Sequence, residues 1–366
     1  MRTRNVYIDC VKAIGICLVI IGHTFGGGLF ALKTYHMPLF FFLAGLLINE
    51  QEPIGCFVRK RIYRLYVPFL IYEMFFLLMH NFLYYFGIVS SFYIFPNDFI
   101  AQIMHIICFD NCEILLAPIW FLTVLFISSV AGKCIIWLAS SDFTGLSGRW
   151  RSIVIVIIGI VLIYGGMING REGILNINAS FNCPQILNIS FVALGYTLFG
   201  YLFKNGAIRD KIKKFKPGQL LVVFLFVGLI IFERRTKLVS DMRANKYTYI
   251  FAAPVFAAIG IAMIFIIAKY IMKILQNKYL EIAKRIILCI GQNTFAIMCL
   301  HPLAFKLVGL LQVNYFGYDK QLLLDWGVVS SDIQWLILDC MVGIMVPLVG
   351  SYFAKKAANI YFERRR

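Results

Sequence analysis

Long apolar runs separated by short charged segments make up most of this chain. Runs of about 17 to 25 apolar residues, broken at charge clusters, predict ten helices that can each cross a hydrocarbon core of roughly 30 Å. The second run is short and contains Pro38, so we expect it to lie partly against protein rather than lipid. Segment 98–109 is either an interfacial helix or a loop. The predicted spans are 10–31, 34–49, 66–88, 114–138, 152–169, 186–203, 218–232, 249–272, 286–311 and 333–353.

Composition agrees with this pattern. Of the 366 residues, 61% are apolar and only 14% are charged, with a mean hydropathy of +0.81. These values exclude an ordinary soluble domain and predict an all-α, multi-pass protein of a cell membrane, for which we expect a bacterial inner or plasma membrane. No repeat and no Gly/Ser-rich or Pro-rich linker divides the chain, so we take residues 1–366 as one membrane domain without an appended soluble domain.

The distribution of positive charge predicts the orientation. With ten crossings, 26 of the 35 Lys and Arg residues fall on the side that holds both termini and eight on the other, with Lys306 inside the ninth span. Both termini are therefore predicted to be cytoplasmic. Because the net charge of +17 lies in the loops of one side, it indicates contact with membrane lipids rather than with nucleic acid. Loop 233–248, with five basic residues, breaks the trend: it either weakens the neighbouring helix predictions or marks a basic surface.

The first span contains ionisable residues. A charged residue at the centre of a membrane helix costs about 2.5 to 3.5 kcal/mol, so Lys12 and His23 are expected to face protein or water. Eleven residues at 100° each place both side chains on one helix face, roughly 16 Å apart, with Asp9 one turn before Lys12. His23 is either a general base for an alcohol or a histidine that only joins two helices.

Ten cysteines lie mostly in apolar spans, where a free thiol behaves as a small apolar group. We predict neither a disulfide framework nor a metal site. One bridge among Cys108, Cys112 and Cys183 remains an alternative in an oxidising compartment.

Several segments, in this order along the chain, resemble a known family. RNVYIDCVKAIGICLVIIGH, YHMPLFFFLAGLL and RKRIYRLYVPF near the start, IWFL at 119–122 and IGQNTFAIMCLHP at 290–302 resemble motifs of the integral-membrane acyltransferase family 3, in particular its fucose O-acetylase-like, sugar O-acetyltransferase branch. Two positions depart from it: Lys12 stands where the family often has Arg, and Ala44 where it commonly has Ser. Lys keeps the charge but loses the bidentate geometry of Arg.

The resemblance implies transfer of an acetyl group from cytoplasmic acetyl-CoA to a hydroxyl of a cell-surface or lipid-linked saccharide of the cell envelope. It implies that His23 is the catalytic base. Asp9 and Lys12 either assist it by orienting the donor or form an interfacial ion pair. Arg61 and Arg64, which match the family's Arg-x-x-Arg motif, would bind phosphates of coenzyme A, the alternative being membrane anchoring.

Five further residues are candidates for binding the acceptor. His36 is either an acceptor ligand or an interfacial polar residue, and Trp120 either stacks on a sugar or belongs to an aromatic belt. Glu73 needs a partner inside the membrane. Asn293 and His301 belong to a polar stripe that indicates either a wet cavity or helix packing, and Pro302 is expected to bend that helix. A glycolipid or saccharide transporter remains the alternative function, although the paired broken helices typical of transporters are not evident.

Overall fold

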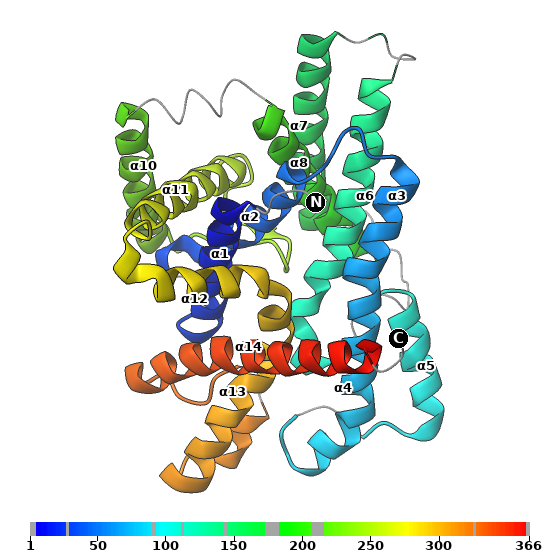
Figure 1. Ribbon diagram of the computed structural model, residues 1–366, viewed down its shortest axis with the longest axis vertical. Helices are drawn as coiled ribbons and strands as arrows, with labels where there is room; N and C mark the ends of the chain where they lie inside the picture. Colours follow the sequence, from blue (N-terminus) through cyan, green and yellow to red (C-terminus); the bar gives the residue numbers. More distant parts are fainter. Residues whose placement is uncertain are drawn as a thin grey trace. The chain divides into compact units, whose positions relative to one another are not determined.

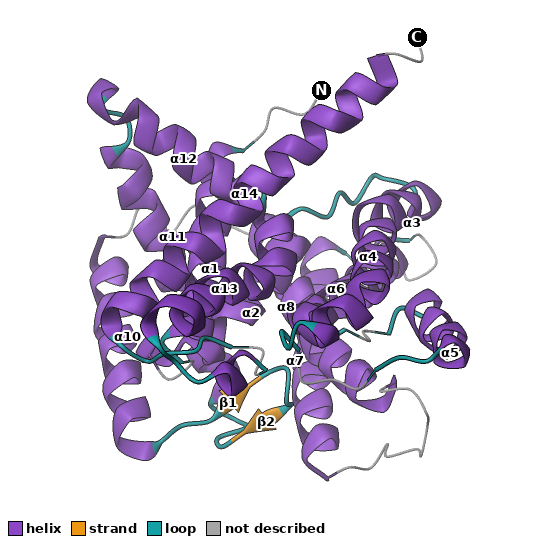
Figure 2. Cartoon of the chain, turned by 90° about the horizontal axis from the view of Figure 1, so that it is seen from below, coloured by secondary structure: helices purple, strands orange, loops and turns teal. Residues whose placement is uncertain are grey.

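The computed structural model describes residues 5–26, 29–89, 93–110, 113–141, 145, 147–172, 183–205, 216–324 and 327–363. Helices dominate these residues, and eight of the helices described are long and apolar enough to cross a membrane. The prediction of an all-α, multi-pass membrane protein is confirmed (Figure 1). Within the same residues, one two-stranded antiparallel hairpin interrupts the helices, and Figure 2 shows it in orange.

The chain folds as two compact units, each built from segments that are distant in sequence. The first unit combines residues 1–29, 71–119 and 267–366, and its long helices pack on one another around α13 and α1. Its elements are α1 (Val6–Thr24), most of α4 (Val67–Tyr85), α5 (Pro96–Ile107), η3 (Ile114–Ile119), η5 (Lys278–Leu280), α12 (Glu281–Gln292), α13 (Thr294–Phe316), η6 (Lys320–Leu323) and α14 (Ile333–Glu363).

The second unit combines residues 30–70 and 120–266, and α8 is its central helix, in contact with α2, α6 and α7. Its hairpin pairs Ser240 with Tyr247 and Asp241 with Lys246. Its elements are η1 (Leu29–Ala31), α2 (Leu32–Leu46), α3 (Ile54–Arg61), a π-helical turn η2 (Ile62–Tyr66), α6 (Trp120–Ser140), α7 (Gly148–Glu172), α8 (Cys183–Asn205), α10 (Lys216–Thr236), β1 (Ser240–Asp241), β2 (Lys246–Tyr247) and most of α11 (Ala253–Ile274).

Local sequence explains where α1 starts and stops. The Asn5 side chain accepts hydrogen bonds from the backbone N–H groups of Tyr7 and Ile8, at 3.1 and 3.3 Å, which satisfies two donors that the first turn leaves open. Gly26, with φ of +85°, follows two residues after the helix ends. This backbone conformation is one that glycine adopts without steric cost. The helix therefore presents Asp9 in its first turn and His23 in its last.

Two boundaries differ from the sequence prediction. The predicted ninth span, 286–311, is broken at Asn293 into α12 and α13, and α13 continues through Pro302. The Asn293 amide donates to the Cys289 carbonyl at 2.8 Å, a local bond that competes with helix continuation. Segment 98–109, left as helix or loop, is helical as α5 and begins with Pro96 in its first turn. The third span begins earlier, so that 54–85 forms one continuous helical stretch.

The short helix α2 is held by very close contact with α8. A Cβ atom added to Gly45 would lie 1.8 Å from the Thr197 carbonyl oxygen, and one added to Gly200 would lie 1.9 Å from that of Phe42. Backbone therefore meets backbone on both sides of the crossing, as in the small-residue interfaces of membrane helices. Most of α2 is buried, as predicted from Pro38 and its length. Its buried residues are Leu32, Thr34, Tyr35, Pro38, Leu39, Phe41, Leu43, Ala44 and Gly45.

We predict that Gly45→Ala and Gly200→Ala each lower the thermal stability and yield of detergent-solubilised protein, because the backbones would have to separate by more than 1 Å. Gly165→Ala in α7 is the matched control, since nothing lies within 4 Å of its added Cβ. Alanine there should be neutral or stabilising by about 0.5 to 1 kcal/mol. Size-exclusion chromatography and thermal melts provide the measurement. Equal melting temperatures for all three variants would contradict the close crossing.

Candidate functional site

His23 and His301 meet in the first unit. Nδ1 of His23, in the last turn of α1, lies 2.7 Å from Nε2 of His301 in α13, and the two rings stack at 4.9 Å between centroids with planes 17° apart. The His301 side chain is fully buried, whereas His23 is half-buried. Two histidines 278 residues apart in sequence therefore form one hydrogen-bonded pair, which no local pattern in the chain encodes.

The partners of His301 define the proton positions in this pair. Its Nδ1 lies 3.0 Å from the Ile297 carbonyl oxygen, which only accepts hydrogen bonds, so Nδ1 of His301 carries the proton. In the neutral ring Nε2 of His301 is then an acceptor, and Nδ1 of His23 must donate to it. The neutral His23 ring is left with its lone pair on Nε2. That nitrogen is the one that can take a proton from another group.

Pro302 contributes to this geometry from within α13. It has no N–H, so the carbonyl of Met298, four residues earlier, lacks its usual helical partner. The His301 imidazole interacts with this carbonyl as well as with that of Ile297. The His-Pro sequence therefore supplies backbone acceptors that orient His301.

Neighbouring side chains of the first unit pack α1, α4 and α14 around the pair. The Thr24 hydroxyl lies 3.1 Å from the Cys340 Sγ of α14. Glu73 of α4 has no exposed surface and acts electrostatically on Cys299, two residues before His301. Tyr72, the residue before Glu73, packs its ring edge to face on that of Phe295, with 5.5 Å between the ring centroids. Glu73 thus belongs to the same helix cluster as the histidine pair.

Asp9 and Lys12 lie in the first turns of α1. Their charged atoms are 3.7 Å apart, with the Asp9 side chain 5% exposed and that of Lys12 27% exposed. Helix α12 passes directly over this turn, because a Cβ on Gly291 would lie 1.9 Å from the Asp9 carbonyl oxygen. The ion pair predicted one turn apart is present, and Lys12 retains accessible surface.

Asn293 lies at the break between α12 and α13. Its side-chain oxygen accepts hydrogen bonds from Ser351 at 3.0 Å and from Lys355 at 2.6 Å, both on α14. These contacts fasten the break to the last helix. Asn293 therefore acts on helix packing in this structure, while His301, from the same predicted polar stripe, contacts His23.

Arg61 and Arg64 belong to the second unit, at the join between α3 and the π-helical turn η2. π-Helical turns inside α-helices are frequent at functional sites. The Arg61 guanidinium lies 4.8 Å from the centre of the Phe57 ring, and Arg64 is exposed. Among the described residues neither forms a salt bridge. The two positive charges act on each other and the charge of Glu52 acts on Arg61, but with no salt bridge to either arginine within the described residues an anion can bind here.

The other two predicted residues of the second unit are placed as follows. Nδ1 of His36 in α2 is in hydrogen-bond contact with the Leu32 carbonyl one turn earlier, which leaves Nε2 for another contact. Trp120 is half-buried at the start of α6, with its ring edge-on to Phe121 at 6.4 Å between centroids.

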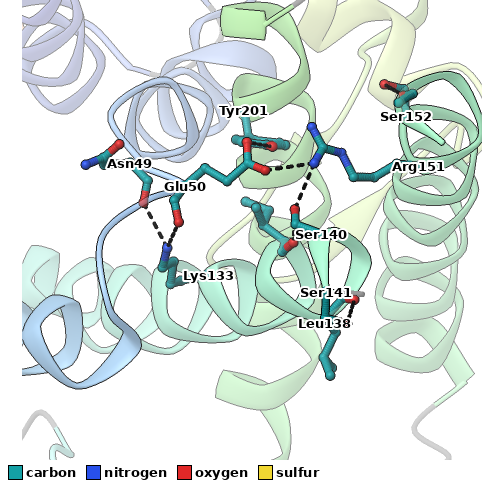
Figure 3. A network of polar contacts seen from close by, with 11 residues as sticks. Asn49, Glu50, Lys133, Leu138, Ser140, Ser141, Arg151, Ser152 and Tyr201 are labelled. Carbon is teal, nitrogen blue, oxygen red and sulfur yellow. Dashed lines mark hydrogen bonds and ion pairs between the residues drawn. The ribbon is translucent and has the colours of Figure 1, made fainter. Parts of the chain in front are cut away.

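The sequence analysis did not predict two clusters of polar contacts. In the first unit, Nδ1 of His80 lies 3.0 Å from a carboxylate oxygen of Glu113, and both side chains are buried. In the second unit, Glu50 is bound by Tyr201 and Arg151, and Lys133 of α6 donates to the backbone carbonyls of Asn49 and Glu50 (Figure 3). Their spacing in sequence carries no signal; only a polar residue in an apolar span, as at His80 and Lys133, could have marked them.

Cysteine and metal chemistry is limited within the described residues. Cys108 is an exposed free thiol, and Cys112 and the side chain of Cys183 lie outside those residues, as does any bridge that they form. No three His, Cys, Asp or Glu side chains gather as metal ligands in the part of the chain that the structure describes.

A protein-family model described as an acyltransferase domain matches residues 5–350. The match contains the second unit, most of the first unit and every predicted site residue. No curated protein and no solved structure matches the chain.

We predict that His23 carries its proton on Nδ1. In protein with ¹⁵N-labelled histidine, where five histidines must be assigned, ring-nitrogen shifts of His23 should report this tautomer. His301→Leu removes the acceptor and should release His23 to a mixture of tautomers. His80→Leu is the matched control, because it removes a different buried histidine. A His23 ring protonated on Nε2 in the unchanged protein would contradict the assignment.

Proposed function

The chain belongs to acyltransferase family 3, and on this premise we propose that it is a membrane O-acetyltransferase that moves an acetyl group from acetyl-CoA to a hydroxyl of a cell-surface or lipid-linked saccharide. The observation that carries the proposal is the His23–His301 pair, whose hydrogen bonds leave a lone pair on Nε2 of His23. O-acylation of an alcohol needs such a base, because a neutral hydroxyl is a weak nucleophile.

In the proposed reaction, Nε2 of His23 takes the proton from the acceptor hydroxyl while its oxygen attacks the thioester carbonyl carbon. The tetrahedral intermediate collapses by breaking the carbon–sulfur bond, and the sulfur of coenzyme A leaves with the proton that His23 held. One ester and one free thiol result, and His23 returns to its neutral form. The hydrogen bond to His301 fixes the ring orientation and stabilises the positive charge that His23 carries between the two proton transfers.

We assign the donor end to cationic residues. Arg61 and Arg64 carry no salt bridge among the described residues, and the fork of donors on a guanidinium suits phosphate oxygens. Lys12, partly exposed beside Asp9, would add a point charge for the donor and Asp9 would hold it in place. With a cytoplasmic N-terminus, these residues would face the compartment that contains acetyl-CoA.

We assign the acceptor to the remaining polar and aromatic residues. His36 retains Nε2 for a hydroxyl, and Trp120 is partly accessible, as stacking on a sugar ring requires. Glu73, buried in the helix cluster of the histidine pair, would accept a hydrogen bond from a second acceptor hydroxyl. Asn293 and His301 would act through helix packing and through His23. The setting proposed is the cell envelope, with the enzyme in the bacterial plasma membrane.

We predict that His23→Gln lowers the transfer rate per folded molecule by about two to four orders of magnitude, the usual contribution of general acid–base catalysis. Gln keeps a hydrogen-bonding group next to His301 but cannot take the proton. The measurement is release of free coenzyme A together with mass spectrometry of the acetylated saccharide. A rate near that of the unchanged enzyme would remove His23 from the mechanism. Movement of a glycolipid without consumption of acetyl-CoA would favour a transporter instead.

We predict that Arg61→Ala combined with Arg64→Ala raises the KM for acetyl-CoA at least tenfold and leaves kcat much less affected. Each lost charge-assisted hydrogen bond is worth about 1.5 to 3 kcal/mol, and about 1.4 kcal/mol corresponds to a factor of ten. Lys284→Ala with Arg285→Ala is the matched control, since these cations lie beside Glu281 on α12. An unchanged KM would contradict donor binding by Arg61 and Arg64 and favour the alternative, that they anchor the protein at the membrane surface.

A further inference from the structure

The segment between α2 and α3, residues 47–53, is bound by side chains of three other helices. Lys133 of α6 donates to the carbonyls of Asn49 and Glu50, at 2.8 and 2.7 Å. Lys204 of α8 donates to the Ile48 carbonyl at 2.8 Å. Two ammonium groups therefore bind backbone carbonyls just beyond the C-terminal end of α2, where the helix dipole carries partial negative charge.

Glu50 is the point where this segment makes most of its side-chain contacts. One carboxylate oxygen lies 2.8 Å from an Arg151 nitrogen of α7, and the other accepts a hydrogen bond of 2.8 Å from the Tyr201 hydroxyl of α8 (Figure 3). Arg151 also donates to the Ser140 hydroxyl at 3.1 Å. Burial alone would raise the pKa of Glu50, but the hydrogen bonds with Tyr201 and Ser140 and the charge on Arg151 lower it. Glu50 is thus ionised at neutral pH.

The contacts continue from Glu50 to Arg61 at the end of α3. Tyr201, 2% exposed, belongs to one apolar cluster with Ile48 and Phe57. Phe57 lies inside α3, and the Arg61 guanidinium rests on its ring. Glu52 supports the same stretch from the other side, because it pairs with Lys60 and its charge acts on Arg61. The segment and α3 are thus packed as one piece.

These contacts do more than close a loop. Lys133 has no exposed surface, and a buried ammonium in an apolar helix is retained only where it has partners. Its partners are backbone carbonyls of the segment, so the charge fixes the path of the chain rather than the identity of a side chain. The helix that starts eight residues after the last helical residue of α2 is the one that ends in Arg61.

We propose that Glu50 is a positioning residue that, through Tyr201, Arg151 and the cluster around Phe57, holds Arg61 and Arg64 in the arrangement that binds the phosphates of the acyl donor. This inference rests on the proposed function, since it takes that function's donor as the ligand. Glu50 itself does not touch the donor. Its removal should loosen the segment and spread the two guanidinium groups over more positions, which weakens donor binding while the chemical step proceeds as before.

The test compares Glu50→Ala with Glu281→Ala, an exposed glutamate that also pairs with basic side chains but on α12. Glu50→Ala is expected to raise the KM for acetyl-CoA about tenfold, the equivalent of about 1.4 kcal/mol, with kcat within about twofold. Glu281→Ala should change neither. Glu50→Gln keeps the volume and an acceptor for Tyr201, so it should give a smaller rise and serves if the alanine variant fails to fold. An unchanged KM in both Glu50 variants, or a fall in kcat alone, would overturn the proposal.

A double-mutant cycle separates positioning from general damage. If Glu50 acts through Arg61, then Glu50→Ala should raise the KM by less than about twofold when it is added to Arg61→Ala, because the group that it positions is gone. A full tenfold further increase would show that the two residues act independently and would overturn the proposal.

A readout without substrate distinguishes the failure of this inference from failure of the proposed function. Backbone hydrogen exchange in residues 47–64 should become faster in Glu50→Ala and stay unchanged in Glu281→Ala. If exchange is faster in Glu50→Ala but the unchanged protein neither binds nor consumes acetyl-CoA, Glu50 does hold the segment and the proposed function is wrong. If exchange is unchanged and the unchanged protein uses acetyl-CoA normally, the proposed function stands and the positioning role of Glu50 is wrong.

Discussion

A polar group in an apolar helix needs a partner from the protein itself, and the rest of this structure depends on how that requirement is met. His23 meets it with His301, Lys133 with the carbonyls of Asn49 and Glu50, and Lys306 with the Leu323 carbonyl at 2.6 Å. The first two pairings join segments that are distant in sequence, and the third joins α13 to η6, the next element along the chain. Because an unpaired polar group would cost several kcal/mol in hydrocarbon, each pairing restricts which helices can be neighbours.

A hydrogen bond between two helices also requires that the helices approach each other closely, and close helix crossings provide this approach. In the first unit α12 approaches the Asp9 backbone over Gly291, and in the second α2 meets α8 at Gly45 and Gly200. Without a hydrophobic driving force between helices in lipid, such contact of backbone with backbone provides much of the packing energy. The glycines thus act on chemistry indirectly, since they bring the helices that carry polar groups within hydrogen-bonding distance.

The functional assignment divides between the two units. The first unit contains the histidine pair with Asp9, Lys12, Glu73 and Asn293, and the second contains Arg61 of α3 and Arg64 of η2 together with His36 and Trp120. General-base chemistry is proposed from the hydrogen bonds of one unit, and donor binding from two arginines of the other that form no salt bridge among the described residues. The segment at Glu50 supports the proposal of donor binding, because it shows how an apolar protein can hold cations in a defined arrangement.

The sequence by itself determined the fold class, most of the helix positions and the family, because the length and hydropathy of each span follow from local composition and the motifs occur in order along the chain. It also placed Asp9 one turn from Lys12, since helical periodicity is local. Only the tertiary structure decided that His301 is the partner of His23, that the predicted ninth span breaks at Asn293 into α12 and α13, and that Lys133 binds the carbonyls of Asn49 and Glu50. These features depend on which helices pack together, and a hydropathy pattern does not specify that choice because every apolar face fits lipid as well as another helix.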